Sequence, residues 1–145
     1  MYSLYIEKNI SPEDFLKKVL KKYHIEYDIF YNEYGKPYLK NNELYFNISH
    51  SKEYIVIAVS DKEIGVDIEH ITFNEKTADR ICTKEERKKV KTDLDFTKIW
   101  TKKEAYIKKI GMGLEYGMKN VDTTKIDNID IYKKDDYIIA ICYEK

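Results

Sequence analysis

The sequence predicts an α+β fold, with small antiparallel sheets and a few packed helices. Helical and strand-like patterns alternate along the chain, but without the strand–helix–strand rhythm that a parallel sheet requires. Strand-like segments follow one another closely at residues 44–71, where short turns favour antiparallel pairing. The strongest helical pattern comes later, at residues 96–111. A chain of 145 residues has the length of one compact domain with a buried core.

A strand at residues 2–6 and an amphipathic helix are the first elements expected. Ser11 suits the helix N-cap, Pro12 the first helical position and Asp14 the third. The apolar residues that follow recur at helical spacing, and lysines occupy the opposite side of the helix. These apolar residues are Phe15, Leu16, Val19, Leu20 and Tyr23.

Alternation of apolar and polar residues predicts the strands that come next. The pattern spans residues 25–31 and is followed by a NEYGKP turn at 32–37, a short strand around Leu39 and a KNNE turn at 40–43. Beyond this turn lies the strand LYFNISH. The segments EYIVIAVS and IGVDIEHI, joined by the turn SDKE, are predicted to pair as an antiparallel hairpin.

Helices dominate the prediction for the next part of the chain. Residues 73–92 are polar and compatible with helix, and Thr83 and Glu86 have the spacing of a capping box. The helix at 96–111 has an apolar side and places Gly111 at its C-cap. The last strands are expected near residues 128–132 and 137–142.

Composition and charge exclude several classes of protein. Lysine plus arginine and aspartate plus glutamate number 26 each, so the formal net charge is zero, which argues against binding to nucleic acid. No apolar run approaches the roughly 18 residues of a membrane span. Cys82 and Cys142 lack the spacing of a zinc site, so we expect reduced, buried thiols. These features predict a soluble, cytoplasmic protein that does not act at a membrane.

Two acids stand two positions apart in the strand-like segment GVDIE, residues 65–69. Side chains at i and i+2 of a strand share one face, so Asp67 and Glu69 lie together on one side, opposite the apolar residues. Taken alone, such a pair is typical of a solvated strand surface.

The helix at 96–111 offers a second charged pair. Glu104 and Lys108 are four residues apart and share a helix face, which by itself is typical of a surface ion pair. His50, at the end of a predicted strand, is by itself more typical of a core histidine than of a functional one.

The combination of these residues indicates chemistry at phosphate. Three carboxylates are what Mg²⁺ requires when phosphate and water complete its shell, and oxygen ligands alone do not distinguish Mg²⁺ from Mn²⁺. A neighbouring lysine and histidine would neutralise or hydrogen-bond the remaining phosphate oxygens. The residue types therefore predict metal-assisted phosphoryl chemistry.

Four segments in order make the sequence resemble the 4′-phosphopantetheinyl transferases. They are GKP at 35–37, FNISHS at 46–51, GVDIE at 65–69 and WTKKEAYIKKIGMGL at 100–114. The Ser-His pair precedes the Asp strand, as in the monomeric class whose two similar halves form a pseudo-dimer, and unlike the homotrimeric holo-carrier synthases. The resemblance implies two halves related by a pseudo-twofold axis, each with a small antiparallel sheet and a packed helix. We expect the boundary to divide the chain into 1–62 and 63–145.

The resemblance also implies an activity. The 4′-phosphopantetheine arm of coenzyme A would pass to a serine of an apo acyl or peptidyl carrier protein, and adenosine 3′,5′-bisphosphate would leave. The implied metal ligands, for Mg²⁺ or Mn²⁺, are Asp67, Glu69 and Glu104. The implied coenzyme A-binding residues are Lys36, Ser49, His50, Asp67 and Lys108.

A base must also take the proton of the carrier serine. Glu86 lies where the family carries an acidic residue proposed for this task, which would make it a catalytic group beside Glu104 and Lys108. The same glutamate completes the predicted capping box, so base and cap both stay open, and the two roles need not exclude one another. Glu85 is the neighbouring candidate.

The match departs from the family in the stretch before GKP, which is shorter than in the class it resembles. In relatives, basic residues of that stretch help to hold the 3′-phosphate, and no motif here singles out one lysine among residues 17–22. Two other functions stay open: a non-catalytic relative that binds coenzyme A or carriers, and a metal-dependent phosphodiester hydrolase. The carrier is not indicated, and two fused halves lead us to expect a monomer.

Overall fold

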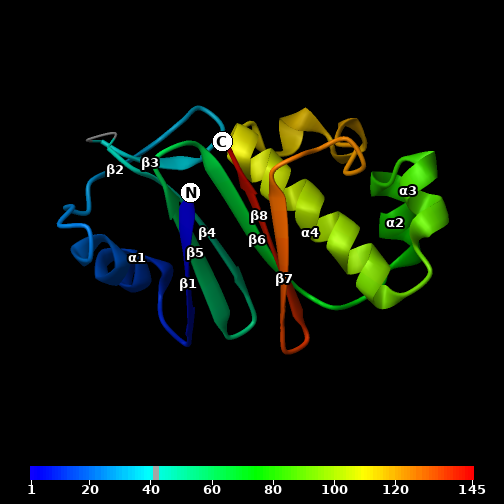
Figure 1. The fold of residues 1–145 in the computed structure, drawn as a ribbon, viewed down its shortest axis with the longest axis horizontal. Helices are drawn as coiled ribbons and strands as arrows, with labels where there is room; N and C mark the ends of the chain where they lie inside the picture. Colours follow the sequence, from blue (N-terminus) through cyan, green and yellow to red (C-terminus); the bar gives the residue numbers. More distant parts are fainter. Residues whose placement is uncertain (41–42) are drawn as a thin grey trace.

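A computed structural model describes residues 1–40 and 43–145, apart from the side chains of residues 114 and 115. The α+β fold is confirmed, with small antiparallel sheets and several helices (Figure 1). The predicted KNNE turn contains residues 41 and 42, which lie outside the described residues. The elements in chain order are β1 (Tyr2–Lys8), α1 (Pro12–Lys21), β2 (Ile29–Tyr31), β3 (Pro37–Leu39), β4 (Tyr45–Ser51), β5 (Tyr54–Ser60), β6 (Ile64–His70), α2 (Glu75–Ile81), α3 (Lys84–Lys89), α4 (Asp93–Ile110), the 3₁₀ helices η1 (Gly113–Tyr116) and η2 (Met118–Asn120), β7 (Ile129–Lys134) and β8 (Tyr137–Tyr143).

Two three-stranded antiparallel sheets with the same connectivity form the body of the protein. The strand order is β1-β5-β4 in the first sheet and β6-β8-β7 in the second. Each sheet starts with a strand, continues after one or more helices, and ends in a hairpin whose last strand takes the central position. Figure 1 shows α1 beside the first sheet and α4 lying along the second. Strands β2 and β3 form a separate two-stranded ribbon.

Hydrophobic clusters join these layers. Helix α1 packs on the first sheet through a cluster that contains Leu20 and Ile57. Strands β5, β6 and β8 share a second cluster, including Val56 and Val66, which connects the two sheets. Helix α4 packs on the second sheet through small residues such as Ala105. The second sheet is therefore covered on one side by α4 and on the other by the first half of the chain.

The predicted hairpin of EYIVIAVS and IGVDIEHI is wrong. The two segments form β5 and β6, but β5 pairs with β1 and β4, whereas β6 pairs with β8. Apolar residues of both strands are buried in one shared cluster, although the two strands do not pair with each other. The hairpin that forms instead joins β4 to β5 and turns at Lys52, whose φ is 54°.

Other predicted boundaries shift by a few residues. The strand predicted at 25–31 is confined to β2, because the partner strand β3 offers only three residues for pairing. The helix predicted at 96–111 begins three residues earlier, because Thr92 and Asp95 form a capping box at its start. It ends before Gly111, whose φ of 79° suits the C-cap.

Several local predictions are confirmed. Ser11 caps α1, and its side chain accepts the backbone N–H of Asp14. Thr83 and Glu86 form the predicted capping box at the start of α3. Cys82 and Cys142 are free and buried.

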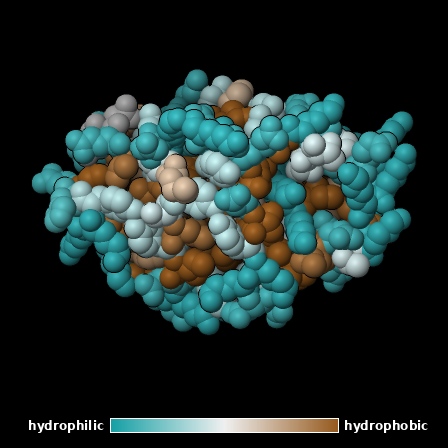
Figure 2. All heavy atoms as spheres, in the orientation of Figure 1, coloured by the Kyte–Doolittle hydropathy of each residue, from teal (hydrophilic) through white to brown (hydrophobic). Residues whose placement is uncertain are grey.

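The surface alternates between hydrophilic and hydrophobic areas. On the face seen in Figure 2, hydrophilic side chains form most of the margin and hydrophobic patches lie between them. Four exposed aromatic side chains come from one segment around β2: Tyr27, Phe30, Tyr31 and Tyr34. Within the described part of the chain, no helix is both long enough and apolar enough to cross a membrane.

A buried ion pair joins α3 to α4. The Lys103 ammonium lies 2.7 Å from Glu86 Oε1, and the two side chains are 0% and 1% exposed. Lys103 also donates to two backbone carbonyl oxygens, at 2.5 and 3.1 Å. Glu86 accepts from the backbone N–H of Thr83 through Oε1, and from the N–H and hydroxyl of Thr123 through Oε2. Burial acts to raise the pKa of Glu86, but Lys103 and these hydrogen bonds outweigh it and lower the pKa.

Helix α4 touches β6 directly at Gly65. A Cβ at this position would lie 2.1 Å from the carbonyl oxygen of Ala105 and 2.4 Å from the backbone nitrogen of Lys109. Because these are backbone atoms of a helix, they cannot move aside as a flexible side chain would. The absence of a side chain at Gly65 therefore sets how closely α4 approaches the strand.

We predict that Gly65→Ala lowers the free energy of unfolding by about 3 kcal/mol, since the new methyl group must push α4 away from β6. Gly113→Ala is the control, because its Cβ would meet nothing closer than 3.7 Å. The control should lose only the roughly 1–2 kcal/mol of a left-handed backbone conformation. Urea unfolding measures both, and a Gly65→Ala protein as stable as wild type would show that the contact is not tight.

We predict that Lys103→Met costs about 3–5 kcal/mol near neutral pH, because it leaves Glu86 buried without its cation. In the wild type, the lowered pKa of Glu86 stabilises the fold above the normal glutamate pKa, and this contribution is lost as pH falls through the lowered value. The Lys103→Met variant should not show this loss of stability as the pH falls. The double change Glu86→Gln with Lys103→Met should regain part of the stability, and equal single and double losses by denaturant titration would contradict the pairing.

Candidate functional site

Three carboxylates and one lysine meet between β6 and α4. Asp67 and Glu69 follow Gly65 at two-residue steps, so they share the face of β6 that α4 covers. Glu104 and Lys108 come from the part of α4 that packs there. The structure thus brings together the four charged residues that the sequence placed on two separate elements.

The electrostatic environment shows that these groups affect one another. Burial raises the pKa of Asp67, and the neighbouring Glu69 and Glu104 carboxylates raise it further against the opposing effect of Lys108. Burial and Glu69 likewise raise the pKa of Glu104. Burial lowers the pKa of Lys108, while all three carboxylates act to raise it. Three acids with a single lysine form a site that an additional cation would stabilise.

The three carboxylates Asp67, Glu69 and Glu104, called here the acid set, have the chemistry of a hard-cation site, although they do not form a closed ligand cage. Asp67 is 5% exposed, and its Oδ2 is buried without a hydrogen-bond partner in the described residues. Over the same residues, no group of three or more potential ligands is already gathered around one point. Carboxylate oxygens are the ligands that Mg²⁺ prefers, and an open Oδ2 is available for one. The donor set therefore fits a divalent cation that substrate oxygens would help to bind.

Lys108 connects the acid set to the first half of the chain. Its ammonium donates to the carbonyl oxygen of Ile48, on β4, at 2.6 Å. This bond holds the lysine at the junction between β4, β6 and α4. A phosphate group placed there would meet a fixed positive charge.

The two residues of the Ser-His pair have different surroundings. Ser49 is 7% exposed; its hydroxyl donates to Asp67 Oδ1 at 3.0 Å and accepts the backbone N–H of Ile68 at 3.1 Å. His50 is exposed at the end of β4 and lines a hollow of about 370 Å³ beside the start of α1. Of the pair, His50 is the one open to a ligand.

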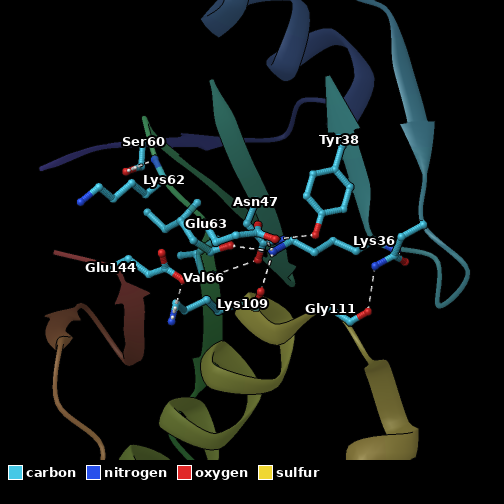
Figure 3. Close-up of polar contacts among 12 residues, drawn as sticks. Lys36, Tyr38, Asn47, Ser60, Lys62, Glu63, Val66, Lys109, Gly111 and Glu144 are labelled. Carbon is cyan, nitrogen blue, oxygen red and sulfur yellow. Dashed lines mark hydrogen bonds and ion pairs between the residues drawn. The ribbon is translucent and has the colours of Figure 1, made fainter. Parts of the chain in front are cut away.

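Lys36 is buried in contacts within the protein (Figure 3). It is 7% exposed, and its ammonium donates to Glu63 Oε1 at 3.0 Å and to the carbonyl oxygens of Ile64 and Lys109 at 3.1 and 2.9 Å. These bonds account for its three ammonium protons. Lys36 therefore fixes the GKP turn against β6 and the end of α4.

One pocket lies at the Lys108 end of the acid set. This GKP pocket has a volume of about 210 Å³ and is enclosed by the 34–37 turn, β4 and the end of α4. Its walls include Pro37, Ile48 and Lys108. They are mainly apolar, which suits a flat or apolar group next to a charged one.

A second pocket lies at the Glu69 end. This Trp100 pocket, of about 260 Å³, has an aromatic base formed by Phe96 and Trp100, whose rings stack at 6.3 Å between centroids. Its polar rim includes Glu69 and Arg80. Sequence reasoning missed this pocket, because Arg80 comes from α2, whose position relative to β6 has no local signal.

Glu86 lies in the ion pair with Lys103 and is not among the lining residues of the GKP pocket or the Trp100 pocket. At 1% exposure and with hydrogen bonds to both carboxylate oxygens, it has no free atom for a substrate. Glu85 is exposed and contacts Lys88 at 3.4 Å. The capping alternative for Glu86 is thus the one that the contacts favour.

The lysines of α1 make surface contacts. Lys17 pairs with Glu13 at 3.5 Å, and Lys18 pairs with Glu7 at 2.9 Å, all with well-exposed side chains. Such pairs open at little cost, so both lysines remain accessible to an anion.

Comparison with known proteins gives a consistent family. The family model of the 4′-phosphopantetheinyl transferase superfamily matches residues 63–142, more than half of the chain. The chain is 34% identical over 125 residues to the 4′-phosphopantetheinyl transferase gsp of Aneurinibacillus migulanus, covering 78% of this chain and 51% of that protein. It is 35% identical over 118 residues to a 4′-phosphopantetheinyl transferase of Bacillus subtilis, covering 75% and 49%.

A third relative has a greater share of its length covered. The 4′-phosphopantetheinyl transferase AcpT of Salmonella typhi is 30% identical over 128 residues, which cover 79% of this chain and 66% of AcpT. The chain thus spans about half the length of the first two relatives and about two thirds of the third. With the family model matched from Glu63 to Cys142, the chain belongs to the 4′-phosphopantetheinyl transferase superfamily.

Proposed function

We propose that this protein transfers the 4′-phosphopantetheine arm of coenzyme A to a serine of an apo acyl or peptidyl carrier protein. The observation that carries the proposal is the partly buried acid set with Lys108, which has a pocket at each end. Family membership and the names of the relatives support the same reaction.

Coenzyme A has its charged pyrophosphate in the middle, an adenosine 3′-phosphate at one end and an uncharged pantetheine arm at the other. We place the pyrophosphate at Lys108 and the acids, and the adenosine in the GKP pocket, whose walls are mainly apolar. The pantetheine arm would then extend towards the Trp100 pocket. His50 is open to the 3′-phosphate, and Lys36 shapes the adenosine pocket without contacting phosphate directly.

Asp67, Glu69 and Glu104 are the residues that would hold Mg²⁺, or Mn²⁺ in its place. The cation would neutralise charge on the pyrophosphate when bound. The open Asp67 Oδ2 and the mutual repulsion of the carboxylates support this assignment.

The chain's own groups prepare the transfer. Lys108, fixed by its bond to Ile48, stabilises charge on the departing phosphate oxygen. The walls of the two pockets orient the phosphorus so that a carrier serine can approach from the side opposite the leaving group. We assign Glu86 to the buried ion pair rather than to the role of base.

We propose two halves, residues 1–62 and 63–145, related by a pseudo-twofold axis; the shared connectivity of the two sheets supports this relation. Since both halves belong to one chain, the site needs no second subunit, and we propose a monomer. The free, buried cysteines suit the reducing cytoplasm, where coenzyme A and its carriers meet.

A non-catalytic relative that binds coenzyme A or a carrier is the second candidate. It is favoured by one observation: the described acids are near one another but are not gathered as a ready ligand group. A protein of this kind would bind coenzyme A without modifying any carrier.

We predict that the protein, with Mg²⁺ and coenzyme A, adds one phosphopantetheine to an apo carrier, measured as intact carrier mass across a panel of acyl and peptidyl carriers. Asp67→Asn and Glu104→Gln should each slow the transfer by about 100-fold or more, because each removes a charge that the cation needs. Glu85→Gln removes an exposed carboxylate of the same size and should leave the rate unchanged.

Two results would count against this assignment. Near-normal transfer by either acid variant would show that the cation is held elsewhere. Coenzyme A binding by the wild type without modification of any carrier would favour the non-catalytic relative.

A further inference from the structure

Strand β6 has one edge paired with a strand and one edge that is not. The paired edge follows β8 over seven residues. At the other edge, two N–H groups are bonded to side chains of β4 instead of to a backbone. Val66 donates to Asn47 Oδ1 at 2.8 Å (Figure 3), and Ile68 donates to Ser49 Oγ at 3.1 Å. Two side chains of β4 thus take the place of a neighbouring strand.

The two side chains differ in what else they contact. Asn47 is 3% exposed and, among the described residues, supports the edge of β6 without a hydrogen bond to Asp67, whereas Ser49 also donates to Asp67 Oδ1 at 3.0 Å. Ser49 therefore links the carboxylate of Asp67 to the N–H of the next residue, Ile68. This link fixes the direction of the carboxylate relative to the strand.

The hydrogen bonds of Ser49 leave its hydroxyl no proton to donate to a ligand. A hydroxyl has one proton, and the bond to Asp67 uses it. What remains on Ser49 Oγ is a lone pair, which repels the oxygens of a phosphate. At the same time, Asp67 Oδ2 is left without a partner in the described residues. Ser49 thus holds Asp67 Oδ1, and Asp67 Oδ2 is open to a ligand.

We propose that Ser49 is a positioning residue: it turns the open oxygen of Asp67 towards the divalent cation and does not contact a phosphate of coenzyme A. The inference rests on the proposed function, since it assumes that the acids bind a cation. It differs from the phosphate-binding role that the sequence resemblance implied for this serine.

The test compares Ser49→Ala with Asn47→Ala, which removes the matching support of β6 but no bond to Asp67. Mn²⁺ affinity is measured by electron paramagnetic resonance with coenzyme A present, and coenzyme A affinity by calorimetry at saturating Mn²⁺. Loss of a partner behind a metal ligand typically weakens metal binding by about 10-fold or more, which is the result expected for Ser49→Ala. Asn47→Ala should change Mn²⁺ affinity by less than about threefold, since it leaves Asp67 held.

Two further variants separate orientation from folding. Ser49→Thr keeps the hydroxyl and should restore Mn²⁺ affinity to near the wild-type value. Ser49→Cys keeps the shape with a weak donor, so it should lose Mn²⁺ affinity while its circular dichroism stays unchanged. Coenzyme A affinity at saturating Mn²⁺ should be the same in the wild type and in the three Ser49 variants.

Equal losses of Mn²⁺ affinity in Ser49→Ala and Asn47→Ala would overturn the proposal, because Ser49 would then only support the strand. Weaker coenzyme A binding with unchanged Mn²⁺ affinity would also overturn it and restore a direct phosphate contact. No Mn²⁺ binding by the wild type would overturn it as well. Carrier modification by the wild type is assayed in parallel: the proposed function fails only if that transfer is absent.

Discussion

The contact between Gly65 and the backbone of α4 is the constraint on which the site depends. A strand and a helix normally pack with a layer of side chains between them, but here the backbone atoms of Ala105 and Lys109 occupy the space of a missing Cβ. Because Asp67 and Glu69 follow on the same face, this approach brings them to Glu104. Hydrophobic clusters on the two sides of the second sheet keep β6 in place, so Glu69 and Glu104 lie close to the buried Asp67 despite their repulsion.

A second constraint acts across the two halves. The side chains of β4, the GKP turn and the end of α4 meet at β6, and polar contacts rather than strand pairing hold them together. Lys36 and Lys108 each span this junction by donating a hydrogen bond to a backbone carbonyl oxygen. Asn47 and Ser49 accept hydrogen bonds from the N–H groups at the unpaired edge of β6. The proposed coenzyme A site lies along this junction, so the contacts that join the halves also shape its walls.

Much of the fold could be predicted from local patterns. Ser11, the Thr83–Glu86 box and Gly111 mark helix ends through interactions within a few residues, and these predictions are confirmed. The pairing of β5 with β6 was wrong because a short turn and alternating residues favour a hairpin, whereas the partner of β6 lies some seventy residues away. Nothing in the local sequence distinguishes these two pairings.

The site likewise combines features that follow from local spacing with features that follow only from tertiary contacts. Spacing alone placed Asp67 with Glu69 and Glu104 with Lys108, and the fold brings the two pairs together. The roles of Lys36 and Ser49 depend on tertiary hydrogen bonds that use up their protons, which no motif reveals. The fully buried pairing of Glu86 with Lys103 is likewise a property of the packed helices.

The most direct measurement is a crystal structure of the protein with Mn²⁺ and coenzyme A, in which anomalous scattering locates the metal independently of any assumed ligand. A peak at ligand distance, about 2.2 Å, from carboxylate oxygens of both Asp67 and Glu104 is the predicted result. A metal bound elsewhere, or coenzyme A bound away from Lys108 with those carboxylates unoccupied, would contradict a shared cation site between β6 and α4.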